Sequence, residues 1–340
     1  RFGFKSRGLG DVYKRQMYNN IAETDRQIGA VLDQLEADGL LDQTIIFFYA
    51  DHGGPLPRQK RLIYDSGLNS PMIIRFPNAQ KAGSKDDQLL SFIDFAPTVL
   101  SLVGISLPDY LQGQAFLGKA KADQPRDYIH AAADRFDGFT DAIRAVRDSQ
   151  FKYIRNYRPQ QGYYLPVVYR ERIPTMRELI RLRDKGTLNE YQAQWFRETK
   201  DEEELFDCLN DPHELHNLAD DPDHQEKLAE LQAEMDRWLA AIGDQPNLPE
   251  AELLNQLWQG DDKKPSTLPP KIDFEEGVLT ISCDTEGASI GYKLIESGSD
   301  EPAAWSVYTG PVTITRAHQV LVQSHRIGFV PSEIISYDLN

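Results

Sequence analysis

The chain has little of what marks a disulfide-rich, membrane-spanning or nucleic-acid-binding protein. Its 340 residues include only two cysteines, Cys208 and Cys283, and their wide separation predicts two isolated structural thiols rather than a disulfide framework. The longest apolar runs, such as residues 44–50, are far shorter than the roughly 20 residues needed to cross a bilayer, so no transmembrane segment is expected. A formal net charge of −16 argues against nucleic acid or an anionic membrane as the main partner.

The charge is unevenly distributed along the chain. Residues 144–185 are rich in lysine and arginine, whereas residues 201–276 are strongly acidic. An anionic ligand could therefore still be met locally. The alternative is that both segments form solvated helix faces.

The first part of the chain alternates between helix and strand patterns. Residues 17–39 carry apolar side chains at helical spacing and end at Gly39, which predicts an amphipathic helix packed on a sheet. Residues 44–50 form an apolar run typical of a strand buried on both faces of a parallel sheet. A strand at residues 71–76 and a helix at residues 93–103 follow. The pattern predicts an α/β fold.

Beyond residue 129 the pattern becomes mixed and then changes to all-β. Strands are expected at residues 142–146 and 151–154, and helices at residues 174–185 and 224–242. Residues 243–270 are rich in Pro, Asp, Asn and Gln, which predicts a linker. Short alternating runs between turn residues in 271–340 predict a small all-β sandwich.

The first chemical signal is Asp51-His52-Gly53-Gly54, directly after the strand expected at residues 44–50. Ligands of open α/β sheets bind at the carboxyl ends of strands. A carboxylate, an imidazole and two glycines that admit close backbone approach suit a metal or oxyanion site. Such a short pattern is more often a turn with a capping aspartate. Lys60 follows nine positions after Asp51, in a basic loop that leads to the next strand.

Several motifs in one order make this pattern specific. The run ADHGGPLPRQKRLIYDSGLNSPMIIRFP resembles the second signature region of the formylglycine-dependent (type I) sulfatases of the alkaline phosphatase superfamily. FIDFAPTVLSLVGI, IRAVRDSQFKYIRNY and ELFDCLNDPHELHNLADDP extend the resemblance over roughly residues 17–242. It is closest to the heparan N-sulfatase branch. The resemblance implies the C-terminal part of an alkaline-phosphatase-like sandwich, with a mixed sheet, flanking helices and a C-terminal subdomain. It also implies hydrolysis of sulfate esters or N-sulfates of a sulfated glycan.

The resemblance assigns roles at the strand end and in the basic loop. Asp51 would be a ligand of one divalent metal, Ca²⁺, which prefers oxygen donors. His52 would stand beside the metal, as a ligand or in contact with the nucleophile or sulfate. Lys60 would bind the sulfate oxygens and stabilise charge on the bridging oxygen. The alternative for Lys60 is a surface lysine in a basic loop.

The resemblance also points to a substrate pocket and to a structural turn. Asp134, Arg135 and Arg144 fall where the family lines its pocket, and a guanidinium there could bind a carboxylate or a second sulfate in two-point fashion. Structural ion pairing is an equal alternative for all three. Residues 210–214 are expected to be structural, as a turn and helix start capped by Asn210 or Asp211.

The nucleophile of the family is missing from the chain. It is a formylglycine made within a C/S-x-P/A-x-R motif, but Cys208 is followed by Leu-Asn-Asp-Pro and Cys283 by Asp-Thr-Glu-Gly. The resemblance places this motif and the other metal ligands in the N-terminal half of the family. We therefore expect half a metal site and little or no turnover by the chain alone. Residues 1–16 match nothing in the family and lack the apolar core of a signal peptide, so they are treated as a non-native or unassigned leader.

Two alternatives remain open. A phosphatase or phosphodiesterase of the same superfamily would use two zinc ions and more ligands than lie near Asp51. A non-catalytic glycan-binding protein is the other, because the run FEEGVLTISCDTEGASIGYKL begins a segment that resembles the chitobiase/hexosaminidase C-terminal module. Trp305 and Tyr308 could stack on sugars there or pack in the core. Sulfatases with such modules usually act on exported glycans, so the resemblance implies a periplasmic or secreted location.

Overall fold

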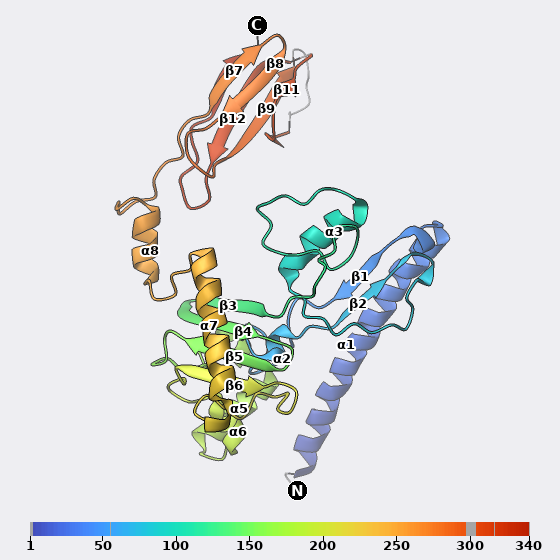
Figure 1. The fold of residues 1–340 in the computed structure, drawn as a ribbon, viewed down its shortest axis with the longest axis vertical. Coiled ribbons are helices and arrows are strands. Elements are labelled where there is room, and N and C mark those ends of the chain that lie inside the picture. The colour runs from blue at the N-terminus through green and yellow to red at the C-terminus, as the bar shows by residue number, and fades with distance from the viewer. Residues whose placement is uncertain (1–2, 55, 297–303, 316, 340) are drawn as a thin grey trace. The chain divides into compact units, whose positions relative to one another are not determined.

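The structure, a computed structural model, describes residues 3–54, 56–296, 304–315 and 317–339, with side chains from residue 15 onward except that of residue 317. The chain divides into two compact units, residues 1–247 and 248–340 (Figure 1). The division falls inside the expected linker, part of which forms the helix α8 (Glu250–Leu257). No helix in the described ranges is both long and apolar enough to cross a membrane.

The centre of the first unit is a four-stranded antiparallel sheet in the order β3-β4-β5-β6. The strands are Ile129–Phe136, Phe139–Arg147, Phe151–Asn156 and Glu203–Asp207. β4 and β5 confirm the strands predicted at residues 142–146 and 151–154. β3 and β6 were not predicted, because alanines and acidic residues, which are depleted in strands, make up much of both.

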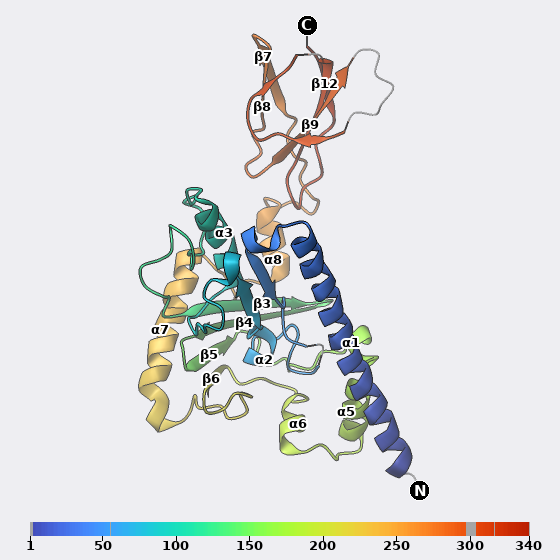
Figure 2. The same cartoon turned by 90° about the vertical axis from the view of Figure 1, so that its right-hand side faces the viewer.

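One face of this sheet is covered by α7 (Gln225–Ile242), which confirms the helix expected at residues 224–242 (Figure 1 and Figure 2). Apolar side chains at helical spacing form one stripe on α7 and pack on the sheet. The buried residues of this cluster are Leu228, Leu231 and Met235 from α7, Val146, Tyr153 and Leu205 from the sheet, and Ala219. Gly243, with φ 66°, ends the helix in the left-handed conformation.

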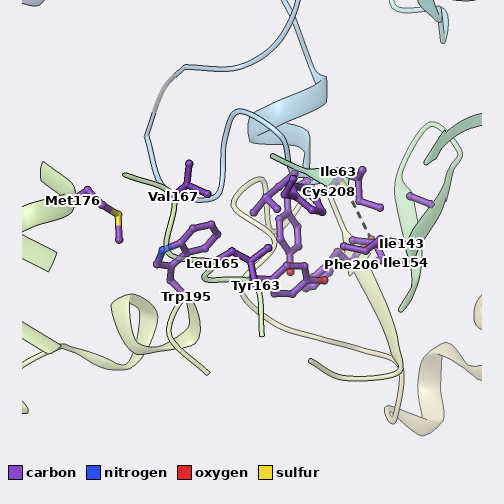
Figure 3. Packing of buried hydrophobic residues seen from close by; sticks show 14 residues of the cluster. Ile63, Ile143, Ile154, Tyr163, Leu165, Val167, Met176, Trp195, Phe206 and Cys208 are labelled. Carbon is purple, nitrogen blue, oxygen red and sulfur yellow. Dashed lines mark hydrogen bonds between the residues drawn. The ribbon is translucent and has the colours of Figure 1, made fainter. Parts of the chain in front are cut away.

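The opposite face of the sheet holds the segment that follows the DHGG motif. Leu62, Ile63 and Tyr64 are at most 5% exposed and pack against sheet residues that include Ile143 and Ile154 (Figure 3). Met176 and Trp195 belong to the same cluster. The helices on this side are α4 (Val168–Glu171), α5 (Pro174–Asp184) and α6 (Glu190–Gln194), and α5 confirms the helix expected at residues 174–185. The core of this subdomain thus fixes the loop that carries Lys60.

β1 (Ile46–Tyr49) and β2 (Met72–Arg75) form a separate two-stranded antiparallel sheet. The expectation of a parallel strand buried on both faces was wrong, since Phe48 and Tyr49 are 43% and 45% exposed. An apolar run reports a tendency to be buried but not the direction or number of partner strands. Within the described ranges, no third strand joins this sheet.

α1 (Gly3–Ala37) and α3 (Phe95–Val103) flank β1 and β2 (Figure 2). α1 contains the helix expected from Met17 but begins much earlier. Its apolar stripe packs only in part, because Met17 and Ile21 are 62% and 55% exposed. α3 confirms the helix at residues 93–103. The short elements are α2 (Asp65–Leu68) and 3-10 turns at Leu41–Gln43, Pro77–Ala79, Phe92–Asp94 and Pro222–His224.

The second unit contains two antiparallel sheets, β10-β9-β12-β13 and β11-β8-β7, which form the expected small β-sandwich. Leu279, Val320 and Val322 are fully buried in its core. Tyr308 packs against this core, whereas Trp305 is 45% exposed. The strands are, from β7 to β13, Lys271–Glu275, Val278–Ser282, Ser289–Glu296, Ser306–Val307, Val312–Thr313, Ala317–His325 and Ile335–Asp338. Residues 297–303 of the expected module lie outside the described ranges.

Candidate active site

The DHGG motif and the loop that carries Lys60 are joined by backbone contacts. The N–H of Lys60 donates to the carbonyl oxygen of Gly54 at 3.0 Å, and the N–H of Gly53 donates to that of Gly67 at 2.9 Å. A Cβ on Gly53 would lie 1.8 Å from the carbonyl oxygen of Ser66. Glycine is therefore required here for close backbone approach, as the sequence suggested. The partner is this loop rather than a ligand.

Asp51 and His52 lie side by side at the end of β1. The Asp51 side chain is 83% exposed, and its Oδ2 lies 3.5 Å from Nε2 of His52. Nδ1 of His52 lies 2.7 Å from the carbonyl oxygen of Gly53. A carbonyl oxygen only accepts hydrogen bonds, so Nδ1 carries a proton, and when the ring is neutral its lone pair lies on Nε2.

This pair fits part of a metal site. It offers one exposed carboxylate and one imidazole nitrogen with an oriented lone pair. Calcium takes about six to eight oxygen ligands, so most of its coordination would come from elsewhere. Asp51 suits such an ion better than His52 does, because imidazole is a softer donor.

The Lys60 loop has an unusual backbone. Arg58 and Arg61 on either side of Lys60 have φ values of 60° and 76°, in the left-handed region that non-glycine residues seldom adopt. Lys60 itself is partly buried. Among the residues that the structure describes, its ammonium forms no ion pair or side-chain hydrogen bond. The ammonium is thus available to an external anion.

Contacts to the subdomain sheet and its flanking turn hold this loop. The Arg58 guanidinium donates to the carbonyl oxygens of His213 and Glu214 at 3.0 and 2.8 Å, and lies 4.2 Å from the centroid of the Tyr64 ring. The Tyr64 hydroxyl donates to the buried carboxylate of Glu204 at 2.8 Å. The strained backbone at Arg58 is therefore compensated by two hydrogen bonds and a cation–π contact.

A second group of potential metal ligands lies beneath the loop, where the oxygens of Asp65 and Glu214 meet the sulfur of Cys208. The Lys152 ammonium is 2.8 Å from Glu214 and also pairs with Asp65. Burial would raise the pKa of Asp65, but Lys152 and Arg147 outweigh it and hold that pKa below its usual range. Burial raises the pKa of the Cys208 thiol to about 12. An internal cation already occupies this site, so we interpret it as structural.

The expected helix start in residues 210–214 was wrong, although the turn is present. The carboxylate of Asp211 accepts the N–H groups of Leu215 and His216 at 2.6 and 2.8 Å and shapes a non-helical loop. Glu214 has a φ of 53° and its carboxylate accepts the N–H of Asp65 at 2.6 Å. The segment is structural, but the sequence gave no sign that it supports the Lys60 loop.

The structure does not bring Arg144 together with Lys60. Arg144 is 2% exposed, and its guanidinium is hydrogen-bonded to Asp134 at 2.7 Å and to Asp244 at 2.5 Å. Because side chains alternate along β4, it lies on the α7 face, opposite the neighbouring Ile143. This geometry agrees with the structural ion pair that the sequence left open. Binding of substrate by Asp134, Arg135 or Arg144 stays a prediction.

Comparisons with known proteins identify the class of this chain. The profile of the sulfatase family matches residues 10–105, and that of the N-sulphoglucosamine sulphohydrolase C-terminal region matches residues 58–172. The chain belongs to the sulfatase family, as its motifs predicted. The first profile begins before Met17, inside the segment treated as a leader.

Curated relatives agree with this assignment. An ulvan-active sulfatase of Formosa agariphila is 62% identical over 328 residues, which cover 96% of this chain and 55% of that protein. Human N-sulphoglucosamine sulphohydrolase is 24% identical over 247 residues, with 65% of this chain and 46% of that protein covered. N-acetylglucosamine-6-O-sulfatase of Bacteroides thetaiotaomicron is 33% identical over 156 residues, which cover 43% of this chain and 28% of that protein. The chain thus spans about half the length of the first two of these relatives.

Proposed function

We propose that this chain forms the C-terminal part of an enzyme that hydrolyses sulfate esters or N-sulfates of a sulfated glycan. One observation carries the proposal. The backbone of the DHGG motif is hydrogen-bonded to the Lys60 loop, so an exposed carboxylate–imidazole pair and an available ammonium lie on adjoining segments. The names of the relatives, which include ulvan-active and N-acetylglucosamine-6-O-sulfatases, support a sulfated glycan as the substrate. Such a substrate suggests a periplasmic or extracellular location.

In this proposal Asp51 and Nε2 of His52 hold one side of a single divalent metal, Ca²⁺. The ion supplies Lewis-acid stabilisation of the sulfate oxygens. Lys60 binds the same sulfate and stabilises negative charge on the bridging oxygen as the bond to sulfur breaks. His52 is kept in one tautomer by the Gly53 carbonyl. The formylglycine nucleophile is not supplied by Cys208 or Cys283, so the chain alone should show little or no turnover.

The test uses residues 17–340 fused behind the nucleophile-bearing part of the Formosa agariphila ulvan-active sulfatase. We expect the fusion to hydrolyse an aryl sulfate and the chain alone to be inactive. Lys60→Met should lower kcat/KM by about 10²–10³-fold, the usual effect of losing one group that stabilises transition-state charge. Lys85→Met removes an exposed lysine of the same unit and should change nothing.

Two results would contradict the proposal. One is robust metal-dependent hydrolysis by the chain alone. The other is a fusion that binds two zinc ions and prefers an aryl phosphate, which would favour the phosphatase alternative.

A glycan-binding role of the second unit has one observation in its favour. The Trp305 ring is 45% exposed and lies against β9, where a Cβ on Gly291 would be 3.4 Å from the ring. An exposed aromatic ring supported from below suits stacking on a sugar. If deletion of residues 271–340 leaves the affinity for a sulfated polysaccharide unchanged, this role is wrong.

A further inference from the structure

Four basic side chains are buried in the described part of the chain, and three of them have carboxylate partners. Arg144 pairs with Asp134 at 2.7 Å, Lys152 with Glu214 at 2.8 Å and Lys200 with Asp141 at 2.5 Å. The fourth is Arg170 of α4, which is 7% exposed. No described residue accepts a hydrogen bond from its guanidinium or pairs with it. A largely buried charge without an internal partner is costly, and no nitrogen of Arg170 is among the fully buried unpartnered atoms, so solvent still reaches the guanidinium.

A second hydrogen-bond donor that lacks a described partner lies near Arg170. Its guanidinium lies 5.5 Å from the centroid of the Trp195 ring. The indole N–H of Trp195 is itself buried and has no hydrogen-bond partner. Burial and the positive charge of Arg61 lower the pKa of Arg170, while the carboxylate of Asp137, which acts in the opposite direction, forms its ion pair with Arg61. One positive charge is therefore left over.

The same contacts link Arg170 to the candidate active site. Arg61 follows Lys60 directly in the loop, and its guanidinium lies 5.1 Å from the centroid of the Tyr169 ring. Tyr169 precedes Arg170 in α4. The Arg61 side chain is 26% exposed, so a solute can reach the Arg61 guanidinium. An anion bound here would lie beside the loop that carries the sulfate-binding lysine.

We propose that Arg170 and Arg61 form an anion subsite that binds a second oxyanion of the substrate, a carboxylate or sulfate on a sugar near the one that loses its sulfate. Guanidinium groups bind planar and tetrahedral oxyanions through paired N–H donors, and Arg170 has all of its donors available. An acidic glycan would thus be held at two points, by Lys60 and by this pair. The subsite depends on the proposed function only for the role given to Lys60.

The test measures anion binding to the whole chain by nuclear magnetic resonance. The indole N–H resonance of Trp195, assigned with Trp195→Phe, reports on Arg170 directly. Sodium glucuronate and sodium sulfate are titrated separately to distinguish a carboxylate from a sulfate. We expect at least one of them to shift this resonance. Arg170→Met should weaken that binding about tenfold or more, the effect of losing one charge-assisted pair. Arg172→Met, which removes an exposed arginine two positions away, should bind like the native chain.

Two further measurements distinguish loss of the anion subsite from failure of the sulfatase proposal and from loss of folding. Lys60→Met should retain the Trp195 response, so failure of the sulfatase proposal would not mimic failure of the subsite. Arg170→Met should melt at the native temperature or above it, because it removes a charge that has no internal partner. The subsite is wrong if neither anion shifts the Trp195 resonance, or if Arg170→Met lowers the melting temperature and leaves anion binding intact.

Discussion

The carboxylate of Glu214 accepts the backbone N–H of Asp65 at 2.6 Å, across 149 positions of sequence. Lys152, on the central strand β5, lies between the two carboxylates and pairs with both. Together with the bonds from Arg58 to the carbonyls of residues 213 and 214, this contact fixes both ends of the loop around Lys60. The position of the proposed sulfate-binding lysine thus depends on the four-stranded sheet of the first unit and on the turn at residues 210–214.

Replacement of Lys152 should therefore be among the most damaging single changes. Lys152→Met would leave Asp65 and Glu214 buried without their cation and should lower the free energy of unfolding by about 3–5 kcal/mol. Thermal unfolding, followed by a signal from the first unit, measures this loss. The exposed Lys185→Met should stay within about 0.5 kcal/mol of the native chain. Equal melting of the two variants would show that the buried cluster adds little.

Two glycine-to-alanine changes should have opposite effects on the free energy of unfolding. Gly53→Ala would place a Cβ 1.8 Å from a backbone oxygen, so the DHGG motif must shift, at a cost of roughly 1–3 kcal/mol. Gly29 lies inside α1 with no atom within 4 Å of an added Cβ, so Gly29→Ala should stabilise the helix by about 0.5–1 kcal/mol. Differential scanning calorimetry distinguishes the two. Similar melting temperatures would argue against the close backbone contact.

The two thiols should react very differently. Both cysteines are free, as the sequence predicted, but Cys208 is buried and its pKa is raised by that burial to about 12. Thiolates, not thiols, are alkylated, so near pH 8 iodoacetamide should modify Cys283 and leave Cys208 intact. Peptide mass spectrometry identifies the modified residue. Rapid labelling of Cys208 in the folded chain would contradict the packing beneath the Lys60 loop.

Glu204 should make stability depend on pH. Its burial raises the pKa above the ordinary value of 4.5, against the opposing hydrogen bonds from Tyr163, Tyr64 and Asn156. The folded state therefore holds this proton more tightly than the unfolded state, and the free energy of unfolding falls as pH rises from about 4.5 through the raised pKa. Glu204→Gln removes this dependence.

The measurement is the difference in unfolding free energy between the native chain and Glu204→Gln at several pH values. The native chain should lose stability relative to the variant as pH rises, by at most about 1.4 kcal/mol per pH unit. A difference that stays constant with pH would mean that Glu204 titrates normally in the fold.

Local patterns in the sequence predicted the elements that depend on local physics. The apolar spacing of α7 and the β-branched content of β4 and β5 specify those elements by themselves. The direction of β1 could not be predicted, because an apolar run does not identify its partner strand. β6 is largely acidic, and strand propensity does not predict such a segment as a strand. Its Glu204 is buried because the hydroxyls of Tyr64 and Tyr163, distant in sequence, donate hydrogen bonds to it.

The candidate site likewise contains residues that local sequence predicts and contacts that it does not predict. Asp51, His52 and Lys60 could be predicted as site residues because their spacing is local and matches family motifs. The contacts of Glu214 with Asp65 and of Arg144 with Asp244 join residues at least 100 positions apart, and no periodicity reports such pairs. The unpaired charge of Arg170 was missed for a similar reason, since the absence of a partner becomes visible only in three dimensions.

The most direct test of the proposed site is the calcium dependence of the fusion protein with Asp51→Asn. Loss of one carboxylate ligand should raise the Ca²⁺ concentration needed for half-maximal aryl-sulfate hydrolysis by about tenfold or more, the usual cost of a lost charged contact. Asp87→Asn, an exposed change in the same unit, should leave the calcium curve unchanged. If Asp51→Asn also leaves that curve unchanged, Asp51 does not hold the metal and the account of this site is wrong.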